Sequence, residues 1–185
     1  MERKTEPWYI HAGLWAVIVI LVVILIQVSI IEPTNVIREE TYFKNESRLR
    51  MENIKQAEIL YEDKHSKFSD NLDTLINFIK TDSSVIALVE GIDTLTQKST
   101  NPFVNLTDGV FTPESLYTSP RSGSFFIVQT DTLLEIDTVI NRRGKIVKID
   151  STTTIGTRYV IENPDSEDKI GDLYSDALRN TASWE

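Results

Sequence analysis

The sequence predicts an α+β protein in which an N-terminal transmembrane helix continues into an amphipathic helix packed on a small antiparallel β-sheet. Three observations support this: an uncharged apolar run near the N-terminus, helical periodicity between residues 51 and 79, and β-branched or aromatic runs at about 124–163. The predicted segments are a short cytoplasmic N-terminus (1–11), the transmembrane helix (12–31), a stalk and amphipathic helix (32–64) and an α+β domain (65–185).

The apolar run Ala12–Ile31 reads AGLWAVIVILVVILIQVSII and carries no charged side chain. Its length is sufficient to span the hydrocarbon core of a bilayer as one helix. We expect an uncleaved anchor, because the run is longer than a signal-peptide core and no small-x-small cleavage site follows it. Trp8, Tyr9 and Trp15 lie near its N-terminal edge, where amphipathic rings favour the membrane interface.

Basic residues lie on both sides of this anchor, and their balance weakly favours a cytoplasmic N-terminus. Arg3, Lys4 and the α-amino group precede the anchor, whereas Arg38 and Lys44 follow it, and then Arg48 and Arg50. The balance counts only the charges close to the membrane. This orientation predicts a single-pass protein of the inner (plasma) membrane. The C-terminal domain would then be periplasmic or otherwise extracytoplasmic.

Charge and composition exclude several classes of function. The formal net charge of −9 lies beyond the anchor, because the acidic and basic residues of segment 1–31 cancel. An acidic domain repels phosphate backbones and anionic headgroups, so no nucleic-acid partner is expected. The chain has no cysteine, which excludes a disulfide, a thiolate nucleophile and cysteine-ligated zinc.

A second helix is predicted from about Asn35 to about Lys64. Pro33 lacks a backbone donor, so the chain should kink or briefly break where it leaves the membrane. The second half of the helix is amphipathic, and its apolar face should pack on the sheet. Residues at three- and four-residue steps form this face: Met51, Ile54, Ala57 and Tyr61.

A polar elbow, EDKHSKFS (62–69), separates this helix from a shorter one, for which Ser69 or Asp70 is the expected N-cap. Apolar residues of the shorter helix recur at i, i+3, i+4 and i+7, which predicts one buried face. They are Leu72, Leu75, Ile76 and Ile79, and the opposite face carries Asp73, Asn77 and Lys80.

Four strands are predicted for the sheet, at 124–130, 133–140, 145–150 and 157–163. The segments NRRG, TTTIG and NPD have turn chemistry, and this close spacing favours an antiparallel meander. Alternation places Leu134, Ile136 and Ile140 on one face and Glu135, Asp137 and Val139 on the other. We expect residues 91–123 to be irregular, and the tail to form a short helix around 171–179 before a mobile end.

These features together resemble a type IV pilin or type II secretion pseudopilin. In that superfamily a tyrosine near the helix end precedes a polar loop, a second aromatic residue and a leucine-x-x-leucine segment. Tyr61, Phe68, Leu72 and Leu75 match this arrangement. The resemblance implies a pilin-like α+β fold that acts in protein assembly.

The peptidase site of the prepilins has no full counterpart here. Gly13 precedes Leu14, but the fifth position after such a cleavage is Ile18 rather than glutamate, and the anchor contains no glutamate. We therefore expect a permanently anchored protein with a pilin-like ectodomain, similar to uncharacterised single-span envelope proteins.

No catalytic, cofactor-binding or metal-binding residue is predicted. His11 and His65 are isolated from any paired carboxylate, Ser66 and Ser69 fit turn and cap positions, and no GxxxxGK[ST] or GxGxxG motif occurs. Some pseudopilins bind calcium near a C-terminal loop, but the acidic run fails the EF-hand spacing and fits a solvated turn. That run contains Asp165, Glu167, Asp168 and Asp172.

We expect a membrane-anchored, non-enzymatic envelope protein that takes part in a secretion, filament or surface assembly. The alternative is a single-span accessory subunit of a larger respiratory, transport or sensory complex. In both cases the partners are the lipid bilayer, through Ala12–Ile31, and other membrane or envelope proteins. Oligomerisation of the chain is left open.

Overall fold

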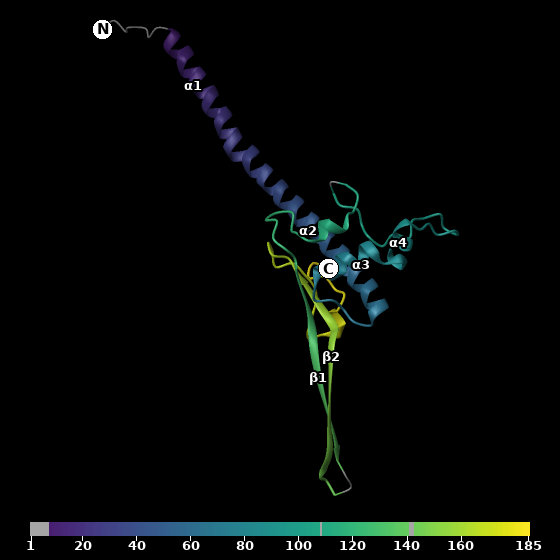
Figure 1. The fold of residues 1–185 in the computed structure, drawn as a ribbon. Helices are drawn as coiled ribbons and strands as arrows, with labels where there is room; N and C mark the ends of the chain where they lie inside the picture. Colours follow the sequence, from purple (N-terminus) through teal and green to yellow (C-terminus); the bar gives the residue numbers. More distant parts are fainter. Residues whose placement is uncertain (1–7, 108, 141–142) are drawn as a thin grey trace. The chain divides into compact units, whose positions relative to one another are not determined.

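The computed structural model describes residues 8–107, 109–140 and 143–185, and the fold is α+β as expected (Figure 1). The described chain divides into two compact units, residues 8–44 and Asn45–Glu185. The first unit is helical. The second contains the remaining helices and a three-stranded antiparallel sheet.

The N-terminal unit begins with the apolar helix α1 (Trp8–Ile26), none of whose side chains is buried within the chain. The helical stretch that starts at Trp8 is long and apolar enough to cross a membrane. A π-helical turn, η1 (Gln27–Ile31), joins α1 to α2 (Glu32–His65). The predicted interruption at Pro33 therefore takes the form of a wider helical turn rather than a break, with the Glu32 N–H donating to the Gln27 carbonyl.

The C-terminal unit has one hydrophobic core, to which the distal part of α2 contributes its amphipathic face. Met51, Ile54 and Ala57 are fully buried, which confirms the predicted packing face of this helix. The sheet supplies buried residues to the same core: Tyr159, Ile161 and Ile170.

The corner between α2 and α3 (Leu72–Thr81) packs as the helical periodicity predicts. Phe68, Leu75 and Ile76 are buried, and Tyr61 and Leu72 are partly buried against the same core. Asp73, Asn77 and Lys80 lie on the exposed face.

The N-cap of α3 is Asn71 rather than Ser69 or Asp70. Its Oδ1 accepts a hydrogen bond from the Asp73 backbone N–H at 2.8 Å. The Ser69 hydroxyl instead bonds to the backbone of Asn71, so it shapes the turn that precedes the cap.

The predicted four-stranded meander is wrong, because the four runs form two long strands. These are β1 (Ile127–Ile140) and β2 (Ile146–Glu162), and a third strand, β3 (Lys169–Gly171), pairs with the end of β2. The segment TTTIG lies inside β2. The register shifts between Thr130 and Thr132, and Gly156 on the opposite strand adopts a φ of 78°.

Asp131 explains why this irregularity is a bulge and not a turn. Its carboxylate accepts hydrogen bonds from the Thr157 N–H, the Thr157 hydroxyl and the Arg158 N–H at 2.6–2.8 Å. These bonds hold the two strands together across the irregular position. Residues with turn chemistry thus continue a ladder, as expected for a β-bulge.

Beyond the bulge, β1 and β2 continue as a two-stranded extension, the hairpin arm, which comprises residues 132–140 and 143–155 (Figure 1). The prediction that one face of this region is buried is wrong, since Ile136, Ile149 and Ile155 are all about 60% exposed. The side chains of Leu134, Glu135, Asp137 and Ile140, to which the predicted alternation also applies, lie outside the described part of the structure.

Two further segments differ from expectation. Helix α4 (Ser83–Glu90), capped by Asp82, was not predicted, and residues 91–123 contain a short 3₁₀ helix, η2 (Pro113–Leu116). The tail forms β3 and η3 (Asp176–Leu178) instead of a helix over 171–179. Its end is not free, because Ala182 pairs with Ile170 and Trp184 packs against the core.

Candidate binding pocket beside α3

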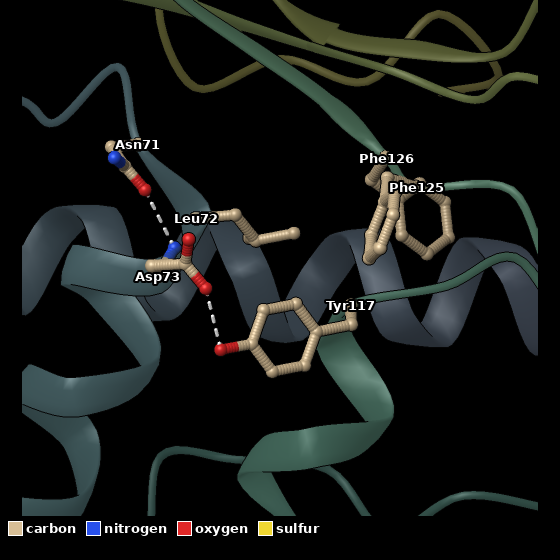
Figure 2. A pocket seen from close by; sticks show the side chains of 6 residues that line it. All are labelled: Asn71, Leu72, Asp73, Tyr117, Phe125 and Phe126. Carbon is tan, nitrogen blue, oxygen red and sulfur yellow. Dashed lines mark hydrogen bonds between the residues drawn. The ribbon is translucent and has the colours of Figure 1, made fainter.

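An open pocket of about 510 Å³ lies beside the N-terminus of α3 (Figure 2). One side is formed by the N-cap and first turn of α3, and the other by the residues after η2 and before β1 (Figure 2). Six residues line it: Asn71, Leu72, Asp73, Tyr117, Phe125 and Phe126.

A short backbone ladder places Tyr117 beside the two phenylalanines. The Phe126 N–H donates to the Tyr117 carbonyl at 3.1 Å, and the Ser119 N–H donates to the Ser124 carbonyl at 2.8 Å. The Asp165 carboxylate holds this loop, since it accepts from the Ser119 hydroxyl at 2.5 Å and from the backbone N–H of Ser122 at 3.1 Å. The loop therefore presents its aromatic side chains from a tethered backbone.

Two hydrogen bonds connect the polar residues of the pocket, one between Tyr117 and Asp73 and one between Asp73 and Asn71. The Tyr117 hydroxyl donates to Asp73 Oδ1 at 2.7 Å, as the dashed line in Figure 2 shows. This hydrogen bond to the carboxylate raises the pKa of Tyr117. Because Tyr117 donates to Asp73, the phenol remains protonated and links the loop to α3.

The remaining wall is apolar and reaches solvent. Phe125 is 67% exposed and lies edge-to-face against Tyr117, with 6.2 Å between ring centroids. Leu72 is half-buried, while Phe126 is buried. An exposed aromatic beside an open apolar hollow is suited to receive an apolar or aromatic side chain, with the hydrogen-bonded Tyr117 and Asp73 oxygens at its edge.

The residues considered as catalytic candidates do not converge on this pocket. His65 is exposed, its Nδ1 lies 3.1 Å from the Tyr61 carbonyl oxygen, and its ring stacks on that of Tyr61. His11 lies on α1 in the other unit. Ser66 is a turn residue with a φ of 56°, and Ser69 serves the turn before α3.

Each aspartate of the acidic loop bonds to a different part of the protein. Asp168 forms a bidentate pair with Arg48 at 2.9–3.0 Å, and Asp172 caps the backbone N–H groups of Tyr174 and Ser175. Asp165 holds the pocket loop, and Glu167 is exposed. Across the described ranges, no group of three or more histidine, aspartate or glutamate side chains could hold a metal ion.

A buried carboxyl group lies behind the corner, on α2. Glu58 is fully buried, and its Oε2 accepts a hydrogen bond from the Ser69 backbone N–H at 3.0 Å. Its Oε1 has no hydrogen-bond partner among the described residues. Burial raises the pKa of Glu58 to about 8, so the side chain is largely protonated at neutral pH.

Searches of family models, curated proteins and solved structures found no match to this chain.

Sequence reasoning identified Leu72 as part of the corner but did not identify the pocket. Tyr117 and Phe125 lie in a segment without periodicity, and the hydrogen bonds of that segment bring them to α3.

Proposed function

We propose that this protein is a single-pass component of the inner (plasma) membrane whose extracytoplasmic domain binds another envelope protein. In this proposal the domain has a pilin-like fold. It takes part in a secretion, filament or surface assembly and has no enzymatic role there. The observation that carries the proposal is the open apolar pocket with the exposed Phe125 at its rim. The long apolar helix that begins at Trp8 supports the membrane anchor.

The chemistry of the pocket favours a protein partner. Its walls offer aromatic and aliphatic surface, and its one carboxylate is already bonded to a tyrosine hydroxyl. Aromatic anchors in such hollows contribute a large share of the binding energy in protein interfaces. A side chain of the partner inserted between Leu72 and Phe125 would cover surface that is now in contact with water.

The membrane orientation is testable by site-directed labelling. A cysteine introduced at Leu95, which is 92% exposed, should react with a membrane-impermeant maleimide in intact spheroplasts. The native chain has no cysteine to compete. Labelling of Leu95→Cys only after membrane permeabilisation would place the domain in the cytoplasm and contradict the proposed location.

Partner binding at the pocket is testable by photocrosslinking in intact membranes. A benzophenone side chain in place of Phe125 should form a discrete adduct with one protein, because the ring lies at the pocket rim. The same photoreactive group in place of Leu95 is the matched control, since Leu95 is exposed but does not line the pocket.

A second change tests whether the adduct depends on the pocket itself. Leu72→Asp places an unpaired charge in the apolar wall and should abolish the adduct at position 125. The melting temperature of this variant shows whether the domain still folds. An adduct that persists in a folded Leu72→Asp variant, or that forms equally from position 95, would contradict the proposal.

A further inference from the structure

The end of the hairpin arm differs in composition from the rest of the chain. Between Thr138 and Ile149 the sequence has four basic residues and no acidic one, although the whole chain has a formal charge of −9. Asp137 and Asp150 lie immediately outside this segment. The four basic residues are Arg142, Arg143, Lys145 and Lys148.

Exposed aliphatic side chains lie among these charges. We call Val139 together with residues 143–149 the basic tip. Its described aliphatic residues are between 50% and 65% exposed: Val139, Ile146, Val147 and Ile149. Arg143, Lys145 and Lys148 are also exposed, and each interacts with another part of the chain.

This combination of residues matches an anionic lipid surface. Aliphatic side chains gain free energy when they leave water for the boundary between headgroups and acyl chains, while lysine and arginine stems extend their charges toward the headgroups. Basic residues near an anionic leaflet add a favourable electrostatic contribution. Nucleic acid fits less well, because the tip has no aromatic side chain for base stacking and the chain as a whole is acidic.

The backbone of the arm limits how deeply the tip can enter. Over residues 132–140 and 146–155 the arm is a two-stranded ribbon, so each described strand pairs on one side only. Unpaired N–H and C=O groups are tolerated among hydrated headgroups but not in the hydrocarbon core. A contact at the level of the headgroups therefore satisfies both the side chains and the backbone.

We propose that the basic tip of the hairpin arm binds the surface of a membrane containing anionic phospholipid. This contact is separate from the protein-binding pocket beside α3. The net charge predicts that the domain repels anionic headgroups. The basic tip is a local exception, because a cluster of basic residues can bind an anionic surface that the remainder of the domain repels.

The test uses the full chain reconstituted in phosphatidylcholine nanodiscs. Binding is measured by flotation with vesicles of phosphatidylcholine alone or of phosphatidylcholine mixed with phosphatidylglycerol. We expect flotation with the anionic vesicles only, and loss of flotation at high salt, because surface electrostatic attraction is screened.

Two variants separate the electrostatic and apolar contributions. Lys145→Gln combined with Lys148→Gln should weaken binding to the anionic vesicles by about 25-fold, or about fivefold per charge. Ile146→Gln should weaken binding by about tenfold without any change of charge. The matched control is Lys67→Gln combined with Lys98→Gln, which removes the same charge from exposed positions outside the tip and should leave binding unchanged.

Three outcomes would overturn the proposal. The first is equal flotation with both kinds of vesicle, and the second is an equal loss in the Lys67 and Lys98 control. The third is a change in the oligomeric mass of the tip variants without any change in vesicle binding, which would identify the tip as a contact between copies of the chain. An unchanged melting temperature of the variants shows that the C-terminal unit is still folded.

Discussion

Leu75→Ala should lower the free energy of unfolding of the C-terminal unit by about 2–5 kcal/mol. Leu75 is fully buried in the core formed by α2, α3 and the sheet, so its truncation removes apolar burial and leaves a cavity. A domain of this size has about 5–15 kcal/mol of stability in total. The loss should therefore appear as a clearly lower denaturation midpoint of the full chain in detergent, followed by near-ultraviolet circular dichroism.

The matched control for this change is Leu95→Ala. The substitution is chemically identical, but Leu95 is 92% exposed, so its effect should be within about 0.5 kcal/mol of zero. His65→Ala should also have a small effect, because the ring is exposed. Equal midpoints for Leu75→Ala and Leu95→Ala would show that the corner between α2 and α3 is not a stabilising core.

The helical part of the fold was predictable because its signal is local. The steps from Met51 through Ile54 to Ala57 follow one face of a helix, and that face is buried. The same holds for Leu75 and Ile76 in α3. The cap of α3 was displaced, since Ser69, Asp70 and Asn71 all have N-capping side chains and the backbone geometry selected the last of them.

The sheet was less predictable because strand ends depend on pairing across the sheet. Glycine and threonine in TTTIG have turn chemistry, yet the three hydrogen bonds from Thr157 and Arg158 to Asp131 keep β2 continuous with its partner. A sequence does not reveal which distant carboxylate will satisfy a backbone irregularity. The exposure of the arm was missed for a related reason, because alternation predicts two faces but not whether either is covered.

The buried carboxyl of Glu58 had a sequence signal that was not used. Glu58 lies four residues after Ile54 and three before Tyr61, so the helical period that places those residues toward the core also places Glu58 there. The pocket had no such signal. Its loop is held by the bond of Tyr117 to Asp73 on α3 and by the bond of Ser119 to Asp165, each of which joins residues far apart in the sequence.

Stability of the C-terminal unit should fall as the pH rises from about 5 to 8, and Glu58 should be the cause. Burial raises its pKa from 4.5 to about 8; the hydrogen bond from the Ser69 N–H acts in the opposite direction, and the negative charge of Asp70 adds to the increase. The folded state therefore holds a proton that the unfolded state releases above pH 4.5. The associated stability is complete below pH 4.5 and is lost as the pH rises through the folded pKa.

The size of this effect follows from the difference between the two pKa values of Glu58. Each pKa unit corresponds to about 1.4 kcal/mol, so the loss over the whole window is on the order of 5 kcal/mol. Denaturation of the full chain in detergent at pH 5, 6, 7 and 8 should reveal it as a falling midpoint. Such a loss is comparable to that expected for Leu75→Ala.

Glu58→Gln should remove this dependence, because glutamine does not titrate. The variant should be more stable than the wild type at pH 8, and its stability should change little between pH 5 and pH 8. Its amide oxygen can still accept the hydrogen bond from Ser69. Glu167→Gln, at an exposed position in the acidic loop, should retain the wild-type dependence. If wild type and Glu58→Gln lose stability in parallel as the pH rises, another group titrates in this window and Glu58 is not held protonated in the folded state.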